Sequence, residues 1–182
     1  MHKLEHFSGG KWVCHSHPPL FERQQTGSYD RLVCGIPGGD PAVMLSLAQC
    51  MSQPFYLLYL LHTPREGAPA GRYQSPPLTN SELHAFFADF APLLRSDARH
   101  DIWIFSPDDR ATLVWDRHNL LYAYGPLDSF TQVLRGLGFH MGTPDIPTPH
   151  AHLYHAEMDG LVRVLLDRYE WIRSDLMPED KQ

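Results

Sequence analysis

The segment from residue 102 to residue 124 constrains the fold most tightly. It consists of three apolar runs joined by two short polar connections: 102–105, 111–115 and 120–124, with 106–109 and 116–119 between them. A connection of four polar residues can only join neighbouring antiparallel strands, because a parallel pair needs a long crossover. The segment therefore predicts a three-strand antiparallel meander, with the second turn at 116–119.

Two helices are predicted from their starting signals. Asp40 followed by Pro41 is typical of a helix N-terminus, and Thr79 with Glu82 has the spacing of a capping box. After Thr79, apolar residues recur at helical spacing and form one stripe: Leu83, Phe86, Phe87, Phe90 and Leu94. Pro92 is expected to kink or split this second helix. Helices alternating with an antiparallel meander indicate the α+β class.

Two further strands and the last elements complete the expected order. Residues 31–36 favour a strand, and the unbroken apolar run 55–61 favours a central strand covered on both faces. Asp128 is expected to cap a short helix, 129–137. A strand at 150–154 and a final helix, beginning near Asp159 and reaching Leu176, are predicted to follow.

The chain length of 182 residues fits a single α+β domain, 1–182, without an interdomain linker. Two long loops are expected at 65–77 and 140–149, and residues 178–182 are expected to fray. No internal repeat is visible.

Composition narrows the expected partners. The formal net charge of -6 gives no field that attracts phosphates, so nucleic acid is not an expected partner. The longest apolar run is too short to cross a bilayer, so no membrane partner is expected. The three cysteines, Cys14, Cys34 and Cys50, are an odd number without paired short spacing and do not resemble a disulfide framework, and a cytoplasmic location is the default expectation. A homo-oligomer is compatible with this sequence.

Histidine is the unusual residue, with twelve in the chain. His150 and His152 lie two apart, which puts them on one face of a strand, and His155 follows. The sequence around them resembles the HxHxDH motif of metallo-β-lactamases over six residues, but Tyr154 stands in place of its aspartate, and the activity of that family is not carried over. These three histidines are nevertheless candidate ligands for zinc or another divalent metal. The competing interpretation, which we favour at this stage, is that the three imidazoles diverge.

A second pair, His15 and His17, has the same spacing, and nothing in the sequence places it near the first. If a metal binds, each imidazole needs an outer partner that fixes its tautomer, and Glu157 or Asp159 is expected to serve.

The expected loop 65–77 carries Arg65, Arg72 and Tyr73, which are residue types favoured in binding sites. With no recognised catalytic motif, the leading functional hypothesis is a non-catalytic binding protein of a bacterial immunity or accessory type, without a cofactor or catalytic residues. One alternative is a metal-dependent hydrolase centred on the histidines. Another is a small-molecule sensor with a pocket between sheet and helices.

Overall fold

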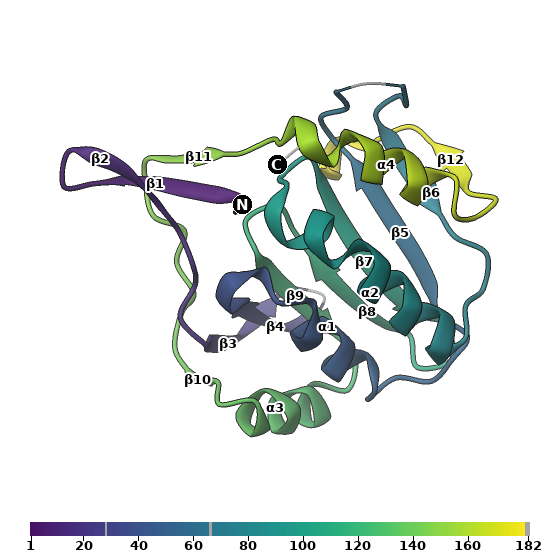
Figure 1. Cartoon of the computed structure of the whole chain (residues 1–182). Helices are drawn as coiled ribbons and strands as arrows, with labels where there is room; N and C mark the ends of the chain where they lie inside the picture. The colour runs from purple at the N-terminus through teal and green to yellow at the C-terminus, as the bar shows by residue number, and fades with distance from the viewer. Residues whose placement is uncertain (28, 66, 181–182) are drawn as a thin grey trace.

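A computed structural model describes residues 1–27, 29–65 and 67–180 of the chain. Over these residues the fold is α+β, as predicted, with four α-helices and two β-sheets (Figure 1). The helices are α1 (Pro41–Ala48), α2 (Asn80–Ser96), α3 (Leu127–Gly136) and α4 (Asp159–Leu166).

The larger sheet has nine strands. In spatial order they are β10 (His140–Met141), β3 (Leu20–Thr26), β4 (Tyr29–Gly35), β9 (Leu120–Tyr124), β8 (Ala111–Trp115), β7 (His100–Ser106), β5 (Tyr56–Leu61), β6 (Gly71–Gln74) and β12 (Ile172–Ser174). All neighbours pair antiparallel except β10 and β3. The predicted meander is confirmed as β7, β8 and β9.

Both predicted helix starts are confirmed. The side chain of Asp40 accepts a hydrogen bond from the backbone N–H of Ala42, and Thr79 and Glu82 form a complete capping box. Such caps satisfy N–H groups that have no partner within the helix. Helix α2 then runs through Pro92 without being divided into two helices.

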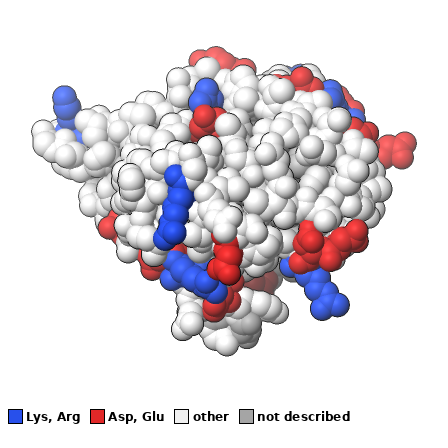
Figure 2. Space-filling model, turned by 90° about the horizontal axis from the view of Figure 1, so that it is seen from below, with Lys and Arg blue, Asp and Glu red and all other residues white. Residues whose placement is uncertain are grey.

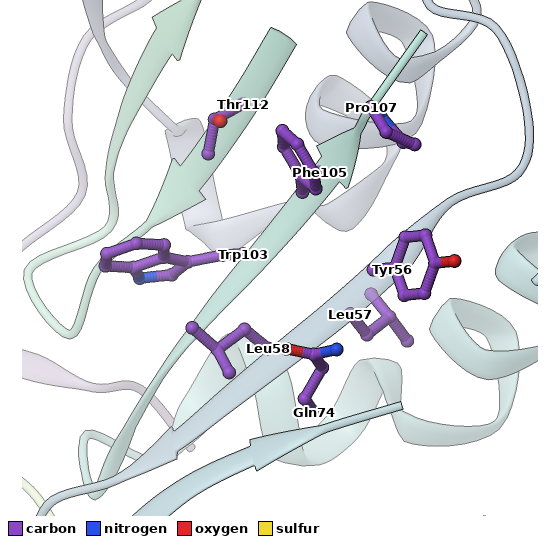
Figure 3. A pocket seen from close by; sticks show the side chains of 8 residues that line it. All are labelled: Tyr56, Leu57, Leu58, Gln74, Trp103, Phe105, Pro107 and Thr112. Carbon is purple, nitrogen blue, oxygen red and sulfur yellow. The ribbon is translucent and has the colours of Figure 1, made fainter. Parts of the chain in front are cut away.

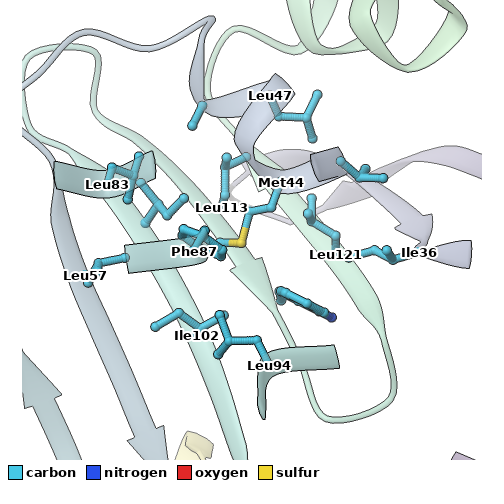
Figure 4. Close-up of a cluster of buried hydrophobic side chains, with 14 of the residues drawn as sticks. Ile36, Met44, Leu47, Leu57, Leu83, Phe87, Leu94, Ile102, Leu113 and Leu121 are labelled. Atoms are coloured by element: carbon cyan, nitrogen blue, oxygen red, sulfur yellow. The ribbon is translucent and has the colours of Figure 1, made fainter. Parts of the chain in front are cut away.

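The core lies between one face of the large sheet and the helices (Figure 4). Leu57, Ile102 and Leu113 project from the strands toward Met44 of α1 and Phe87 of α2, and all five are fully buried. The alternating side chains of the strands and the apolar stripe of α2 thus meet on one side of the sheet.

The opposite face of this sheet is open. Trp103, Val114 and Tyr122 are half-buried there, and α1 and α2 pack on the other side of the sheet (Figure 1). The prediction that strand 55–61 is covered on both faces is therefore wrong, because Leu58 points to the open face and remains partly exposed. An apolar run alone does not distinguish a covered face from an open face lined with large side chains.

The smaller sheet has the order β11 (His150–His152), β1 (Leu4–Ser8) and β2 (Lys11–Cys14). Its β1–β2 hairpin projects from the body of the protein at the left of Figure 1, with β11 beside β1. Strands β1 and β3 were not predicted, because their residues are mostly polar and do not alternate clearly between apolar and polar.

Several boundaries near the C-terminus differ from expectation. Helix α3 begins at Leu127, so Asp128 lies in its first turn and does not cap it. Helix α4 ends at Leu166, and the following residues form β12, which pairs with β6. The helix predicted to reach Leu176 is therefore shorter than expected. Part of its C-terminal half pairs with β6 as a strand, because the edge of β6 offers unpaired backbone groups.

Three segments expected to be irregular are partly ordered. The expected loop 140–149 begins with β10, which pairs with β3. The expected loop 65–77 contains β6, which pairs with β5, so only part of it is a loop. In the expected frayed tail, Asp180 is buried and its carboxylate accepts from the backbone N–H of Met177 and lies 3.4 Å from Arg72. The end of the tail, residues 181–182, lies outside the described residues.

The surface carries charges of both signs. Figure 2 shows one face of the molecule, on which acidic and basic side chains are interspersed. Within the described residues, no helix has the length and apolar character required to cross a membrane.

Candidate metal centre

Three histidines converge where the smaller sheet meets the end of the meander. His118, His150 and His152 each offer one ring nitrogen, and these atoms all lie within 4.8 Å of one another. His118 stacks at a tilt on His152, with ring centroids 4.6 Å apart. The expectation that His150 and His152 diverge is wrong. They share one face of β11, and the turn between β8 and β9 brings His118 to the same place.

The turn that carries His118 is organised by Asp116. One oxygen of its carboxylate accepts from the backbone N–H groups of His118 and Leu120, and the other accepts from Nδ1 of His118 at 3.0 Å. A carboxylate only accepts, so Nδ1 carries the proton and the lone pair of Nε2 is left available. This carboxylate–imidazole pair is the outer-shell arrangement common at zinc sites.

The other two imidazoles also present free lone pairs. Nδ1 of His150 donates to the carbonyl oxygen of Pro147 at 3.1 Å, so its Nε2 is not occupied by this hydrogen bond. Nε2 of His152 is buried and has no hydrogen-bond partner among the described residues. Burial, together with His118, Arg117 and His150, lowers the pKa of His152 to about 4, so its ring is neutral at neutral pH.

The third predicted ligand, His155, lies elsewhere. Its Nε2 donates to the carbonyl oxygen of His2, and its backbone N–H donates to Asp97. The expected outer partner Asp159 instead pairs with Arg99 at 2.7 Å, while Glu157 is exposed in a 3₁₀ turn. The partner that the site does have, Asp116, belongs to the meander turn.

A second group of histidines adjoins the first. His6 lies directly opposite His150 in the β1–β11 pair, and its ring centroid is 5.5 Å from that of His15. His15 in turn contacts His17, whose Nε2 donates to the backbone carbonyl of His118 at 2.8 Å. The two HxH motifs that looked unrelated in the sequence are therefore neighbours.

A groove of about 770 Å³ runs along the open face of the large sheet and ends at His118. Trp103, Val114 and Tyr122 form the middle of its floor. Ile146 of the loop after β10 and Asp180 of the C-terminal segment also line the groove. This volume is in the range of small-molecule sites.

An apolar hollow of about 530 Å³ adjoins the groove (Figure 3). Trp103 and Thr112 line both cavities, and Tyr56, Leu58 and Phe105 line the hollow. Phe105 is 41% exposed and adds apolar surface to the hollow. The open face thus offers a polar groove and an apolar hollow side by side.

The residues predicted for binding in the loop 65–77 do not meet at one site. Arg65 pairs with Asp159, and Arg72 contacts Asp180 and lies over the ring of Trp103. Tyr73 is buried, and its hydroxyl donates to the carbonyl oxygen of Pro69. Their role in binding stays a prediction.

His118 is the site residue that sequence reasoning missed. Asp116 and His118 stand two apart in a turn, and this spacing lets the carboxylate orient the ring, but a polar turn is expected to contain such residues anyway. Comparison of the chain with protein-family models, with curated proteins and with solved structures finds no match.

Proposed function

We propose that this protein is a metal-dependent hydrolase whose divalent ion, zinc in the first instance, is held by His118, His150 and His152. The observation that carries the proposal is the convergence of three imidazole nitrogens within 4.8 Å. In a tetrahedral zinc site with Zn–N bonds of 2.0–2.1 Å, ligand nitrogens stand roughly 3.4 Å apart. Small side-chain movements therefore suffice to close the three rings around an ion.

The number and orientation of the ligands support a catalytic centre over a structural one. Structural zinc sites use four protein ligands, whereas catalytic sites use three and leave a position for water. The groove that ends at His118 supplies a route from that position to solvent and substrate. A zinc ion in such a site lowers the pKa of its bound water to near 7 and thereby generates a hydroxide nucleophile.

The test is the metal content of protein expressed without a His tag. One zinc per chain is expected in the parent, and His118→Ala, His150→Ala and His152→Ala are each expected to lose it. His140→Ala, at an exposed residue outside the cluster, is the matched control and is expected to retain the ion. Zinc-dependent hydrolysis of 4-nitrophenyl acetate, absent in His118→Ala, completes the test. A parent protein that binds no zinc, cobalt or nickel contradicts the proposal.

The apolar hollow favours a second candidate function, the non-catalytic binding of a small apolar ligand. Its exposed Phe105 and half-buried Leu58 would lose contact with water when a ligand enters. A ligand that binds only the folded state raises the melting temperature. A thermal-shift screen of aromatic and acyl compounds tests this function, and Leu58→Lys is expected to abolish any shift.

A further inference from the structure

We propose that the groove binds an extended substrate that carries a carboxylate, and that the guanidinium of Arg31 receives this carboxylate at the far end from the metal. This inference rests on the proposed function, because the metal centre determines where along the groove the hydrolysed bond would lie. The position of the carboxylate is argued from two other observations: the environment of Arg31 and the distribution of charge along the groove.

Arg31 is half-buried in the groove and is held by neutral groups. Its Nε and Nη2 donate to the side-chain oxygen of Gln24 at 3.0 and 2.9 Å, and its Nη1 donates to the hydroxyl of Tyr124 at 3.0 Å. The guanidinium also lies over the ring of Tyr122, 4.7 Å from the centroid. Among the described residues, no carboxylate forms an ion pair with Arg31; Glu22 of β3 shares this face of the sheet but lies opposite Val33.

The hydrogen-bonding capacity of Arg31 is also incompletely used. A guanidinium has five N–H groups, and the three bonds to Gln24 and Tyr124 leave one N–H on Nη1 and one on Nη2. Two such groups match the two oxygens of a carboxylate. Because the side chain is already fixed by its neighbours, binding costs less conformational entropy than binding to a free surface arginine.

The ends of the groove differ in charge. Asp116, Asp101 and the cationic Arg117 line the end near His118, where Asp101 also accepts from His62 and from the backbone N–H of Arg117. Asp180 and its neighbour Glu179 also line the groove. Asp180 lies at the same end as Asp101, because it contacts Arg72, and Arg72 and Asp101 both pair with Leu60 of β5. Arg31 and Arg110 lie at the opposite end, beside Tyr124 and Thr112. The acidic end suits a metal ion, and the basic end suits an anion.

The sheet itself gives the length of the ligand. Along β9 and its neighbours, the row that contains Asp101 is separated from the row that contains Tyr124 by four residues, which corresponds to roughly 13 Å. An extended peptide covers this length in about four residues. The floor between the two ends consists of Trp103, Val114 and Tyr122 and is largely apolar, as expected under a ligand backbone and small side chains.

The proposed substrate is therefore a short peptide, or an amide of similar length, with a free carboxylate. A divalent ion held by His118, His150 and His152 would supply a water nucleophile at this end of the groove, and in the hydrolysis the water oxygen would add to the amide carbonyl carbon. The C–N bond then breaks, and the water protons are divided between the new carboxyl group and the departing amine nitrogen. A single guanidinium matches a monoanionic carboxylate better than a phosphate dianion.

The closing experiment measures the binding of two probes by calorimetry, N-acetyl-tetra-alanine with a free carboxylate and the same peptide as its C-terminal amide. The parent is expected to bind the acid at least about 10-fold more tightly than the amide, because a hydrogen bond to a charged group contributes about 1.5–3 kcal/mol. Arg31→Met is expected to remove this preference, and Arg31→Lys to retain part of it. Arg135→Met, at an exposed residue of α3, is the matched control and is expected to bind as the parent does.

Equal binding of acid and amide by the parent, or no binding of either, overturns the inference. Binding by Arg31→Met that equals that of the parent also overturns it. If inorganic phosphate displaces the peptide acid more effectively than acetate does, the group that Arg31 receives is a phosphate and the proposed carboxylate is wrong. The zinc content of the same samples reports on the metal centre separately, so absence of zinc refutes the proposed function while the acid preference still decides the role of Arg31.

Discussion

Two HxH motifs lie side by side in this protein, and they use their nitrogens differently. In the first, His15 and His17 hydrogen-bond to each other, and His17 donates onward to the backbone carbonyl of His118. In the second, His150 and His152 direct nitrogens toward His118 without bonding to each other, and Nε2 of His152 has no described partner. In the first motif three of the four ring nitrogens form hydrogen bonds within the protein, whereas in the second only Nδ1 of His150 does so among the described residues.

Electrostatics does not separate the two motifs. Burial lowers the pKa of His15 to about 4, with His17, His6 and His150 adding to the effect. Burial also lowers the pKa of His152 to about 4, with His118 as the next cause. Both rings are therefore neutral at neutral pH. The capacity of a histidine to bind a metal therefore depends on which of its ring nitrogens are already hydrogen-bonded, and motif spacing and a neutral ring are insufficient to identify it.

The largest expected effect is on metal affinity. His152→Ala should weaken zinc binding by more than about 100-fold, because loss of a ligand exceeds the 10–100-fold cost of losing an outer-shell partner. His15→Ala should leave zinc affinity at the parent value, although its ring has a similarly lowered pKa. Competition with a chelating dye measures both. Equal losses in the two variants would show that the two motifs bind metal together.

A somewhat smaller effect is expected for Asp116→Asn. The amide would present an N–H group to Nδ1–H of His118 and disturb the tautomer that directs Nε2 to the metal. Zinc affinity should fall by about 10–100-fold. Asp128→Asn, at a fully exposed side chain, is the control. An unchanged affinity in Asp116→Asn would remove Asp116 from the metal centre.

The structural motif should matter more for folding than for metal binding. His17 is 2% exposed and packs against Gly35, where an added Cβ would lie 2.5 Å from Cβ of His17. His17→Ala should lower the free energy of unfolding by about 1–3 kcal/mol, because the carbonyl of His118 loses its donor. Urea denaturation of the metal-free protein measures this. A larger loss in His15→Ala than in His17→Ala would reverse the roles of the two residues.

The smallest effect at neutral pH is expected at His100, a buried histidine that belongs to neither motif. Burial, with smaller contributions from Lys3, Arg99 and His62, lowers its pKa well below 6.5, and both ring nitrogens lack a described partner. Below pH 6.5 the unfolded chain therefore binds more protons here than the native protein, and stability falls with falling pH.

Replacement of this ring tests the source of that acid sensitivity. His100→Leu should be slightly more stable than the parent at pH 7, since no buried polar atoms remain unpaired. It should also lose less stability than the parent between pH 7 and pH 5.5. Urea midpoints at the two pH values measure the difference, with His140→Ala as the exposed control. An acid sensitivity equal to that of the parent would assign the effect to other histidines.

The elements that follow from local chemistry were predictable from the sequence. The meander, the caps at Asp40 and Thr79, and the shared face of His150 and His152 are confirmed. Each depends on residues only a few positions apart. At this range the geometry of a turn, the N–H groups without a partner at a helix N-terminus and the alternation of side chains along a strand determine the local structure. The same local reasoning failed at β12, because pairing with a distant strand outweighed the helical pattern.

Only the tertiary structure decided which residues form the candidate site. His118 joins His150 and His152 because β11 pairs with β1 beside the meander turn, while the chain after β11 carries His155 away to the carbonyl of His2. The openness of one sheet face, and with it the groove that holds Arg31, likewise depends on where the helices pack. Sequence patterns report which face of an element a residue occupies, but contacts between distant elements are fixed by register and packing over the whole chain.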